Sequence, residues 1–158
     1  MNALARVSIA PPHLFIMWSR LLSLLHLRLP FDAGARAERD AGDWLRRERG
    51  FTVVARNWRN PRDRREELDL VCRDGPALVF VEVKARAAGA LVPGYFAVDR
   101  RKKRVLRRAI RAYLRLLATR PETFRFDVVE IALPIRAGGA PRILHFENIP
   151  LFSKHFRP

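Results

Sequence analysis

Two apolar runs joined by a turn constrain this chain more than any other feature of its sequence. Residues 67–71 alternate acidic and apolar side chains, and residues 77–86 are rich in valine and phenylalanine, as expected of paired β-strands. Arg73-Asp74-Gly75 between them provide turn chemistry, because glycine adopts positive φ without strain. The stretch therefore predicts an antiparallel hairpin around which the rest of the chain is organised.

Side chains of a strand alternate between the two faces of a sheet, so the charged and apolar residues of this hairpin separate. One face of the second strand is apolar and is expected to join the core: Val79, Val81, Val83 and Ala85. The other face carries Phe80, Glu82, Lys84 and Arg86. Antiparallel pairing places Asp69 opposite Phe80 or Glu82, so Asp69 and Glu82 come within reach of one metal ion.

Charges in the middle of an apolar hairpin need an explanation, because burying an unpaired charge costs several kcal/mol. In one interpretation the hairpin lies at a sheet edge, and Glu82 and Lys84 are solvated or paired with each other. In the other, Asp69 and Glu82 bind a hard divalent cation, for which one or two carboxylates suffice. Lys84 then orients and activates an attacking water. The pattern alone leaves both interpretations open.

The order Asp69, Glu82, Lys84 resembles the D…(D/E)xK signature of the restriction-endonuclease-like PD-(D/E)XK nuclease superfamily. Further motifs, between about residues 34 and 152, resemble those of the YraN-like family of small bacterial proteins within it: Gly34-x-x-x-Glu38-x-x-Ala41, Trp44-Leu45, Asn57, Glu67-Leu68-Asp69-Leu70, Phe80-Val81-Glu82-Val83-Lys84-Ala85-Arg86, Lys102 and Arg125-Phe126-Asp127-Val128-Val129. The chain departs from the family at Glu66, which replaces a usual glycine and is a competing ligand candidate. The preceding loop, residues 59–65, is also longer than usual.

This resemblance implies a restriction-endonuclease-like core and metal-dependent endonuclease hydrolysis of nucleic-acid phosphodiester bonds, in DNA rather than RNA. The implied cofactor is Mg²⁺ or Mn²⁺. Asp69, Glu82 and Lys84 are the catalytic candidates, and Glu38 joins Asp69 and Glu82 as a candidate metal ligand. Glu67 and Asn57 are expected to support the site.

The remaining pattern predicts one α/β domain, residues 32–158, after an N-terminal extension, residues 1–31. The expected elements are a helix at 33–49, a strand at 51–57, a basic loop at 58–65, the hairpin, a flexible loop at 87–95, a helix at 99–118, and strands at 123–133 and 142–146. This order is a helix, a three-strand meander, a helix, a strand and a strand around a small mixed sheet. The strand–helix–strand unit suggests a parallel crossover.

The helix expected at 99–118 has two contrasting sides. Its apolar stripe is expected to face the core: Val105, Leu106, Ala109, Ile110, Tyr113, Leu116 and Leu117. Its basic residues are candidates for binding nucleic-acid phosphates, together with Arg86: Arg104, Arg107, Arg108, Arg111 and Arg115. Lys102 lies on the inward stripe, so it is expected to point toward the sheet and hold a phosphate there.

The charge balance indicates a polyanionic partner. The 158 residues include 31 basic and 16 acidic side chains, for a net charge of +15, and such an excess favours nucleic acid over a membrane surface. A protein that binds nucleic acid without catalysis is the alternative function. It would use the same basic surface, with the acidic residues in structural roles.

The N-terminal apolar stretch and the cysteine content indicate where in the cell the protein is expected. Residues 14–29 are apolar but too short to span a bilayer, and Arg20, His26 and Arg28 interrupt them, so no stable membrane insertion is expected. Cys72 is the single cysteine, which excludes an internal disulfide; we expect a cytoplasmic protein. A homodimer is compatible with paired strand cuts, although no residue pattern requires it. Asp127 is expected to pair with an arginine, and His145 to be structural or exposed.

Overall fold

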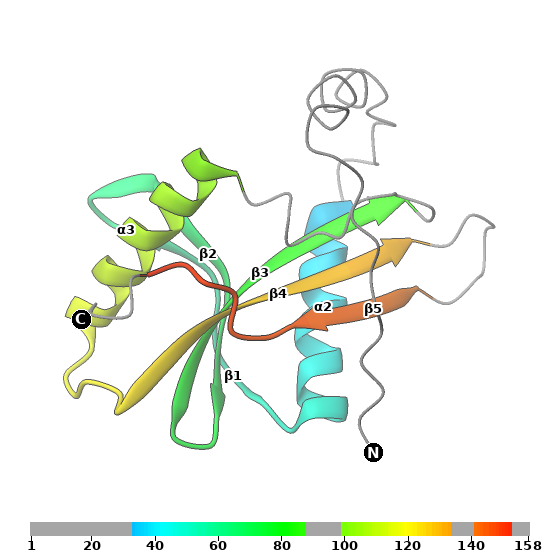
Figure 1. The fold of residues 1–158 in the computed structure, drawn as a ribbon, viewed down its shortest axis with the longest axis horizontal. Helices are drawn as coiled ribbons and strands as arrows, with labels where there is room; N and C mark the ends of the chain where they lie inside the picture. The colour runs from blue at the N-terminus through cyan, green and yellow to red at the C-terminus, as the bar shows by residue number, and fades with distance from the viewer. Residues whose placement is uncertain (1–32, 88–98, 134–140, 153–158) are drawn as a thin grey trace, which may run out of the picture. The chain divides into compact units, whose positions relative to one another are not determined.

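A computed structural model describes residues 33–87, 99–133 and 141–152 as two helices and one five-stranded sheet (Figure 1). The elements are α2 (Ala33–Arg49), β1 (Thr52–Asn60), β2 (Asp63–Asp74), β3 (Ala77–Ala87), α3 (Arg100–Leu116), β4 (Thr123–Leu133) and β5 (Arg142–Phe146). The N-terminal extension and nearly all of the loop expected at 87–95 lie outside these residues. The expected α/β class and element order are confirmed.

The strands lie in the order β1-β2-β3-β4-β5. β1, β2 and β3 form the expected antiparallel meander, β3 and β4 pair in parallel across the α3 crossover, and β5 returns antiparallel to β4. β3 is therefore the central strand. The interpretation of the hairpin as an edge element was wrong, because β4 covers the side of β3 that an edge hairpin would leave to solvent.

Each face of the sheet has its own core. On one face Leu45 of α2 packs with Val79, Val81 and Val83 of β3, as the apolar face of the hairpin predicted. On the other face Phe80 is fully buried with Leu106 and Ile110 of α3. The residues of β3 that alternate with the valines thus point beneath α3 rather than toward solvent, which places Glu82 in a buried environment.

The ends of both helices follow local chemistry. Gly50, directly after α2, has φ +70°, a conformation that glycine adopts without a Cβ clash. Asp99 caps α3, because its side chain accepts a hydrogen bond from the Lys102 backbone N–H at 2.7 Å. The predicted buried stripe fails at Leu116, which ends α3 and is 64% exposed, whereas Leu114 is buried in this last turn instead.

The basic loop predicted at 58–65 is instead the end of a β-hairpin. β1 continues to Asn60, Pro61 and Arg62 form the turn, and β2 begins at Asp63. Asn60 stabilises this turn, because its side-chain oxygen accepts a hydrogen bond from the Arg62 backbone N–H at 3.0 Å. Proline tolerates this position because its fixed φ suits a turn, and the basic side chains of the strands remain exposed.

Candidate active site

The sheet forks at the predicted acidic residues. Pairing between β2 and β3 runs from Asp74↔Ala77 to Leu70↔Val81 and ends there. Beyond this point β1 and β2 turn toward α3, whereas β3, β4 and β5 continue past α2 (Figure 1). Extending the register by one residue places Asp69 opposite Glu82, one of the two pairings expected from the sequence. Both carboxylates therefore lie where the backbone ladder opens.

Glu82 is 1% exposed and has an asymmetric environment. Its Oε1 atom lies 2.7 Å from Lys84 Nζ and 3.1 Å from Lys102 Nζ. Its Oε2 atom is buried and has no hydrogen-bond partner among the described residues. A buried carboxylate oxygen without a donor carries a desolvation cost, and such an atom is a suitable ligand for a hard cation.

Asp69 is fixed by the opposite strand. Its Oδ2 accepts a hydrogen bond from the Val83 backbone N–H at 2.8 Å, so a side chain replaces the ladder bond at the fork. Burial, and next the neighbouring Glu82 carboxylate, raise the pKa of Asp69 to about 7. The two carboxylates thus repel each other, and a bound cation would relieve this repulsion.

Lys102 reaches this centre from α3, as its position on the inward stripe predicted. Burial lowers the pKa of Lys102, but the carboxylates of Glu82 and Asp69 outweigh it, and the net pKa lies above the ordinary value. Lys102 is therefore protonated at neutral pH and cannot serve as a general base. It is suited to hold an anion next to Glu82.

Glu38 of α2 lies at the periphery of this centre. Burial raises the pKa of Glu38, whereas a hydrogen bond from the Asn57 side chain opposes the rise, and the charges of Glu67 and Glu82 add to it. Asn57, which has φ +49°, thus contacts the side chain of Glu38, in line with the supporting position expected for it. Glu67 forms an ion pair with Arg59 at 3.0 Å.

The number of candidate ligands is limited. In the part of the chain that the structure describes, no three histidine, cysteine, aspartate or glutamate side chains come together closely enough to hold a metal ion. The structure thus does not bring Glu38 together with Asp69 and Glu82 as a three-carboxylate set, and its role as a metal ligand stays a prediction. Two carboxylates match the usual coordination of Mg²⁺, which retains several waters, and the partnerless Oε2 of Glu82 fits this requirement.

The basic residues predicted to bind phosphates take different positions. Arg104, Arg108, Arg111 and Arg115 are exposed on α3, whereas Arg107 is half-buried. Arg86 is half-buried near the end of β3, and it shares the face of Glu82 and Lys84 by strand alternation.

Glu66, the competing ligand candidate, has a different role. Its Oε1 lies 2.7 Å from Arg108 Nε, and its Oε2 accepts a hydrogen bond from Asn60 Nδ2 at 2.7 Å. Glu66 therefore joins the hairpin to α3 instead of the metal-binding candidates. The sequence does not reveal this role, because Glu66 meets Asn60 and Arg108 through the hairpin, which the sequence did not predict.

A buried polar cluster on β4 and β5 is structural. Asp127 is 0% exposed, and its carboxylate contacts Arg125 Nε at 3.1 Å and His145 Nε2 at 2.9 Å. The predicted pairing of Asp127 with an arginine is confirmed, and His145 is structural. This cluster compensates the buried charge of Asp127 within the protein.

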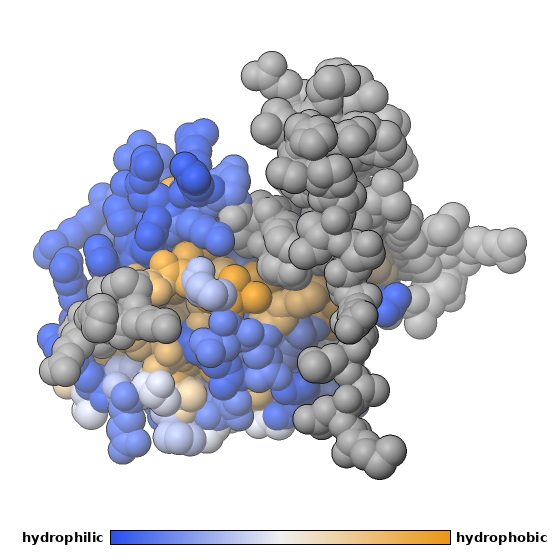
Figure 2. Space-filling model, viewed as in Figure 1, coloured by the Kyte–Doolittle hydropathy of each residue, from blue (hydrophilic) through white to orange (hydrophobic). Residues whose placement is uncertain are grey.

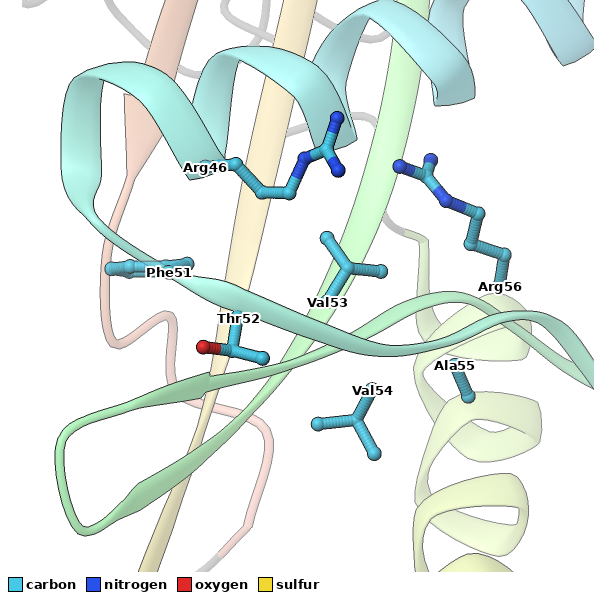
Figure 3. A pocket seen from close by; sticks show the side chains of 7 residues that line it. All are labelled: Arg46, Phe51, Thr52, Val53, Val54, Ala55 and Arg56. Carbon is cyan, nitrogen blue, oxygen red and sulfur yellow. The ribbon is translucent and has the colours of Figure 1, made fainter.

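A hollow of about 580 Å³ lies between the end of α2 and β1 (Figure 3). Arg46 and Arg56 approach it from the two elements, and Val53 lies between them. Its lining contains no carboxylate, histidine or cysteine. The fork, not this hollow, combines acidic and basic groups.

Comparison with known proteins assigns the chain to a family. The model of the "Uncharacterised protein family UPF0102" matches residues 37–131. The chain belongs to this family. The UPF0102 match includes all of the acidic and basic residues at the fork, and it confirms the YraN-like resemblance seen in the sequence.

Relatives that carry the name UPF0102 protein come from several bacteria. A UPF0102 protein of Beutenbergia cavernae is 46% identical over 116 residues, which cover 73% of this chain and 93% of the relative. A UPF0102 protein of Porphyromonas gingivalis is 38% identical over 124 residues, covering 78% and 87%. One of Anaeromyxobacter dehalogenans is 40% identical over 113 residues, covering 72% of this chain and 79% of the relative.

Within the described ranges the helices are α2 and α3, and neither is long and apolar enough to cross a membrane.

Proposed function

We propose that this protein hydrolyses phosphodiester bonds in nucleic acid, DNA in the first place, as a metal-dependent endonuclease. One observation carries the proposal: Glu82 presents a buried, partnerless oxygen beside Asp69, while two lysines occupy its other oxygen. If Glu82 had only a structural role, a hydrogen-bond donor at its Oε2 would make the folded protein more stable than the observed arrangement, in which this oxygen has no donor.

Asp69 and Glu82 are the residues that would hold a divalent cation, Mg²⁺ or Mn²⁺. When bound there, such an ion supplies Lewis-acid activation of the phosphate. Lys102, which stays protonated, would bind a phosphate oxygen, and Lys84 would orient the attacking water. Hydrolysis forms a bond from the water oxygen to phosphorus and breaks the bond to the leaving sugar oxygen; the attacking water gives up one proton and the leaving oxygen takes up one.

The side chains of the candidate site are also held in place by the protein. The Val83 N–H holds Asp69 in place, and the two lysines hold Glu82. These contacts are made within the protein itself, so they hold the acidic and basic groups in fixed positions relative to one another. Preorganisation of this kind lowers the barrier because the groups need no rearrangement during the reaction.

The test is a cleavage assay on duplex, branched and single-stranded DNA and on RNA, with Mg²⁺, Mn²⁺ or chelator. Wild type is compared with Glu82→Gln, which keeps the size of the side chain, and with Asp40→Asn as a control, since Asp40 forms an exposed ion pair with Arg36 at 3.9 Å. We expect metal-dependent cleavage by wild type and the control, and a loss of at least ~100-fold in Glu82→Gln. Equal cleavage by all three proteins would disprove the assignment.

Nucleic-acid binding without catalysis is the second candidate. The observation in its favour is that Lys84 and Lys102 already compensate Glu82, so the acidic centre is stable without a metal. A pure binding protein would cleave none of these substrates, and Glu82→Gln would bind nucleic acid as tightly as wild type or more tightly, because it removes a charge that repels phosphate. In that case Mn²⁺ would raise the melting temperature of wild type and variant equally.

A further inference from the structure

A groove lies between the tip of the β1–β2 hairpin and the outer side of α3. Its volume is about 500 Å³. The hairpin contributes Arg62 and Glu66, and the helix contributes Arg108, Arg111 and Arg115. Hydrophilic residues gather over α3 in the space-filling view (Figure 2). The groove is separate from the acidic centre at the fork, and the proposed reaction does not use it.

The groove has an excess of positive charge. Four arginines and one carboxylate line it, and the carboxylate of Glu66 is already satisfied by Arg108 and Asn60. No carboxylate among the described residues forms an ion pair with Arg62 or Arg115. The guanidinium carbon of Arg111 lies 5.9 Å from the ring centre of Phe152, within the range of a cation–π contact. These cations match a series of phosphates.

Two independent paths give the distance from the groove to the fork. Along β2, Glu66 precedes Asp69 by three residues, which is ~10 Å. Along α3, Arg108 follows Lys102 by six residues, which is ~9 Å, and Arg115 lies ~20 Å from Lys102. Because duplex DNA rises ~3.4 Å per base pair, the groove spans positions about three to six base pairs from the fork.

We propose that this groove binds the sugar–phosphate backbone of the nucleic acid about three to six base pairs from the bond that is cut. The inference rests on the proposed function for the position of the cut, while the binding itself requires no catalysis. Arg62, Arg111 and Arg115 contact phosphates, and the exposed Leu116 at the rim contacts a sugar. Contacts of this kind fix the register of the duplex and do not select its sequence.

The first experiment measures binding in chelator, so that it does not depend on cleavage. Fluorescence anisotropy with a labelled duplex gives the affinity at several salt concentrations for wild type, for Arg62→Ala/Arg115→Ala, and for Arg36→Ala/Arg47→Ala. The control pair removes the same charge from exposed positions on α2, on the opposite face of the sheet. Each lost phosphate contact lowers the slope of log affinity against log salt by ~0.9, so we expect a decrease of about two in the groove variant and none in the control.

The second experiment shortens the duplex. Removing base pairs from the arm that reaches the groove is expected to weaken binding by wild type once fewer than about three to six remain. The groove variant is expected to lose this length dependence, because it lacks the contacts that the longer arm provides.

Other outcomes overturn the proposal. Absence of binding by wild type, or an equal loss of slope in the control, would show that the groove is not a specific backbone site. Unchanged affinity in the groove variant would assign the groove to another partner, such as an acidic protein segment. Groove-dependent binding without metal-dependent cleavage would leave this inference standing and reject the nuclease. Cleavage that depends on Glu82 but not on the groove would support the nuclease and reject this inference.

Discussion

Gly42 of α2 and Arg56 of β1 are in direct contact, because the guanidinium of Arg56 occupies the space that a Cβ on residue 42 would need. From this position Arg56 lies 3.4 Å from the backbone oxygen of Glu38 and 3.5 Å from Asp43 Oδ1. Asn57, the next residue, hydrogen-bonds the Glu38 side chain. A glycine inside a helix thus allows β1 to approach the helix that carries Glu38.

Gly42→Ala is expected to change the free energy of unfolding by less than about 1 kcal/mol. Alanine is more favourable than glycine in a helix by ~1 kcal/mol, but Arg56 must move and lose its exposed contacts, worth ~0–1 kcal/mol. Urea denaturation would measure the net effect. Gly34→Ala is the matched control, because a Cβ there meets no atom within 4 Å. A gain at Gly42 as large as that at Gly34 would contradict the contact.

The stability of the metal-free protein should depend on pH through Asp69. Its pKa is about 7 in the folded protein, against an ordinary value of 3.8. Between these values the unfolded chain has lost the proton that the folded protein keeps. The free energy of unfolding therefore falls as pH rises from about 4 to about 7.

Thermal unfolding of wild type and Asp69→Asn across this range checks the prediction. The variant lacks the titrating group, so its stability relative to wild type should increase with pH and level off above about pH 7. Parallel pH profiles of the two proteins would contradict it. Adding Mn²⁺ at pH 8 should raise the melting temperature of wild type more than that of the variant.

Replacing Asp127 should destabilise the fold strongly. Its carboxylate is fully buried and accepts hydrogen bonds from the Asn148 backbone N–H at 2.8 Å and from Arg125. Asp127→Ala removes the acceptor of the Asn148 N–H and the partner of His145 Nε2, whereas Arg125 keeps its ion pair with Asp74 at 2.9 Å, so we expect a loss of ~3 kcal/mol. Asp127→Asn, which keeps the shape, should cost less. Chemical denaturation measures both, and a loss below ~1 kcal/mol in Asp127→Ala would refute the structural role.

Cys72 should be unreactive in the folded protein. It is 0% exposed, and burial raises the pKa of its thiol to about 12. Reagents therefore cannot reach the sulfur, and the reactive thiolate form is not populated at neutral pH. At neutral pH an absorbance-based thiol reagent should label the native protein at least ~100-fold more slowly than the chain in urea. Rapid labelling of one thiol per native molecule would show that the core around Cys72 is open.

The sequence predicts the parts of this fold that depend on local chemistry. The range of α2, the Asp99 cap of α3 and the two faces of β3 follow from spacing and side-chain type. The inward position of Lys102 follows from helical periodicity. Each of these features is determined by residues within one or two turns of helix or one strand.

Features that depend on distant contacts could not be predicted. The alternation of β2 continues through Asp69, so nothing in the pattern shows that pairing with β3 ends at Leu70. The charged residues of the β1–β2 tip resemble a solvated loop, and they form strands because Trp58 packs on Tyr113 of α3, with ring centres 5.2 Å apart. The difference between the two oxygens of Glu82, of which one contacts lysines and the other has no donor, likewise depends on Lys102, which lies twenty residues further along the chain.

The fork separates the β2–β3 register, which opposes Asp69 and Glu82, from the length of the β1–β2 hairpin tip. The two-residue turn Gly75-Pro76, closed by the Asp74↔Ala77 pair, sets the register of β2 against β3 on one side of the acidic pair. The β1–β2 tip extends on the other side, so residues gained or lost there leave Asp69 and Glu82 opposed. This protein can therefore vary its outer hairpin, and with it the surface offered to a partner, while its acidic centre stays unchanged.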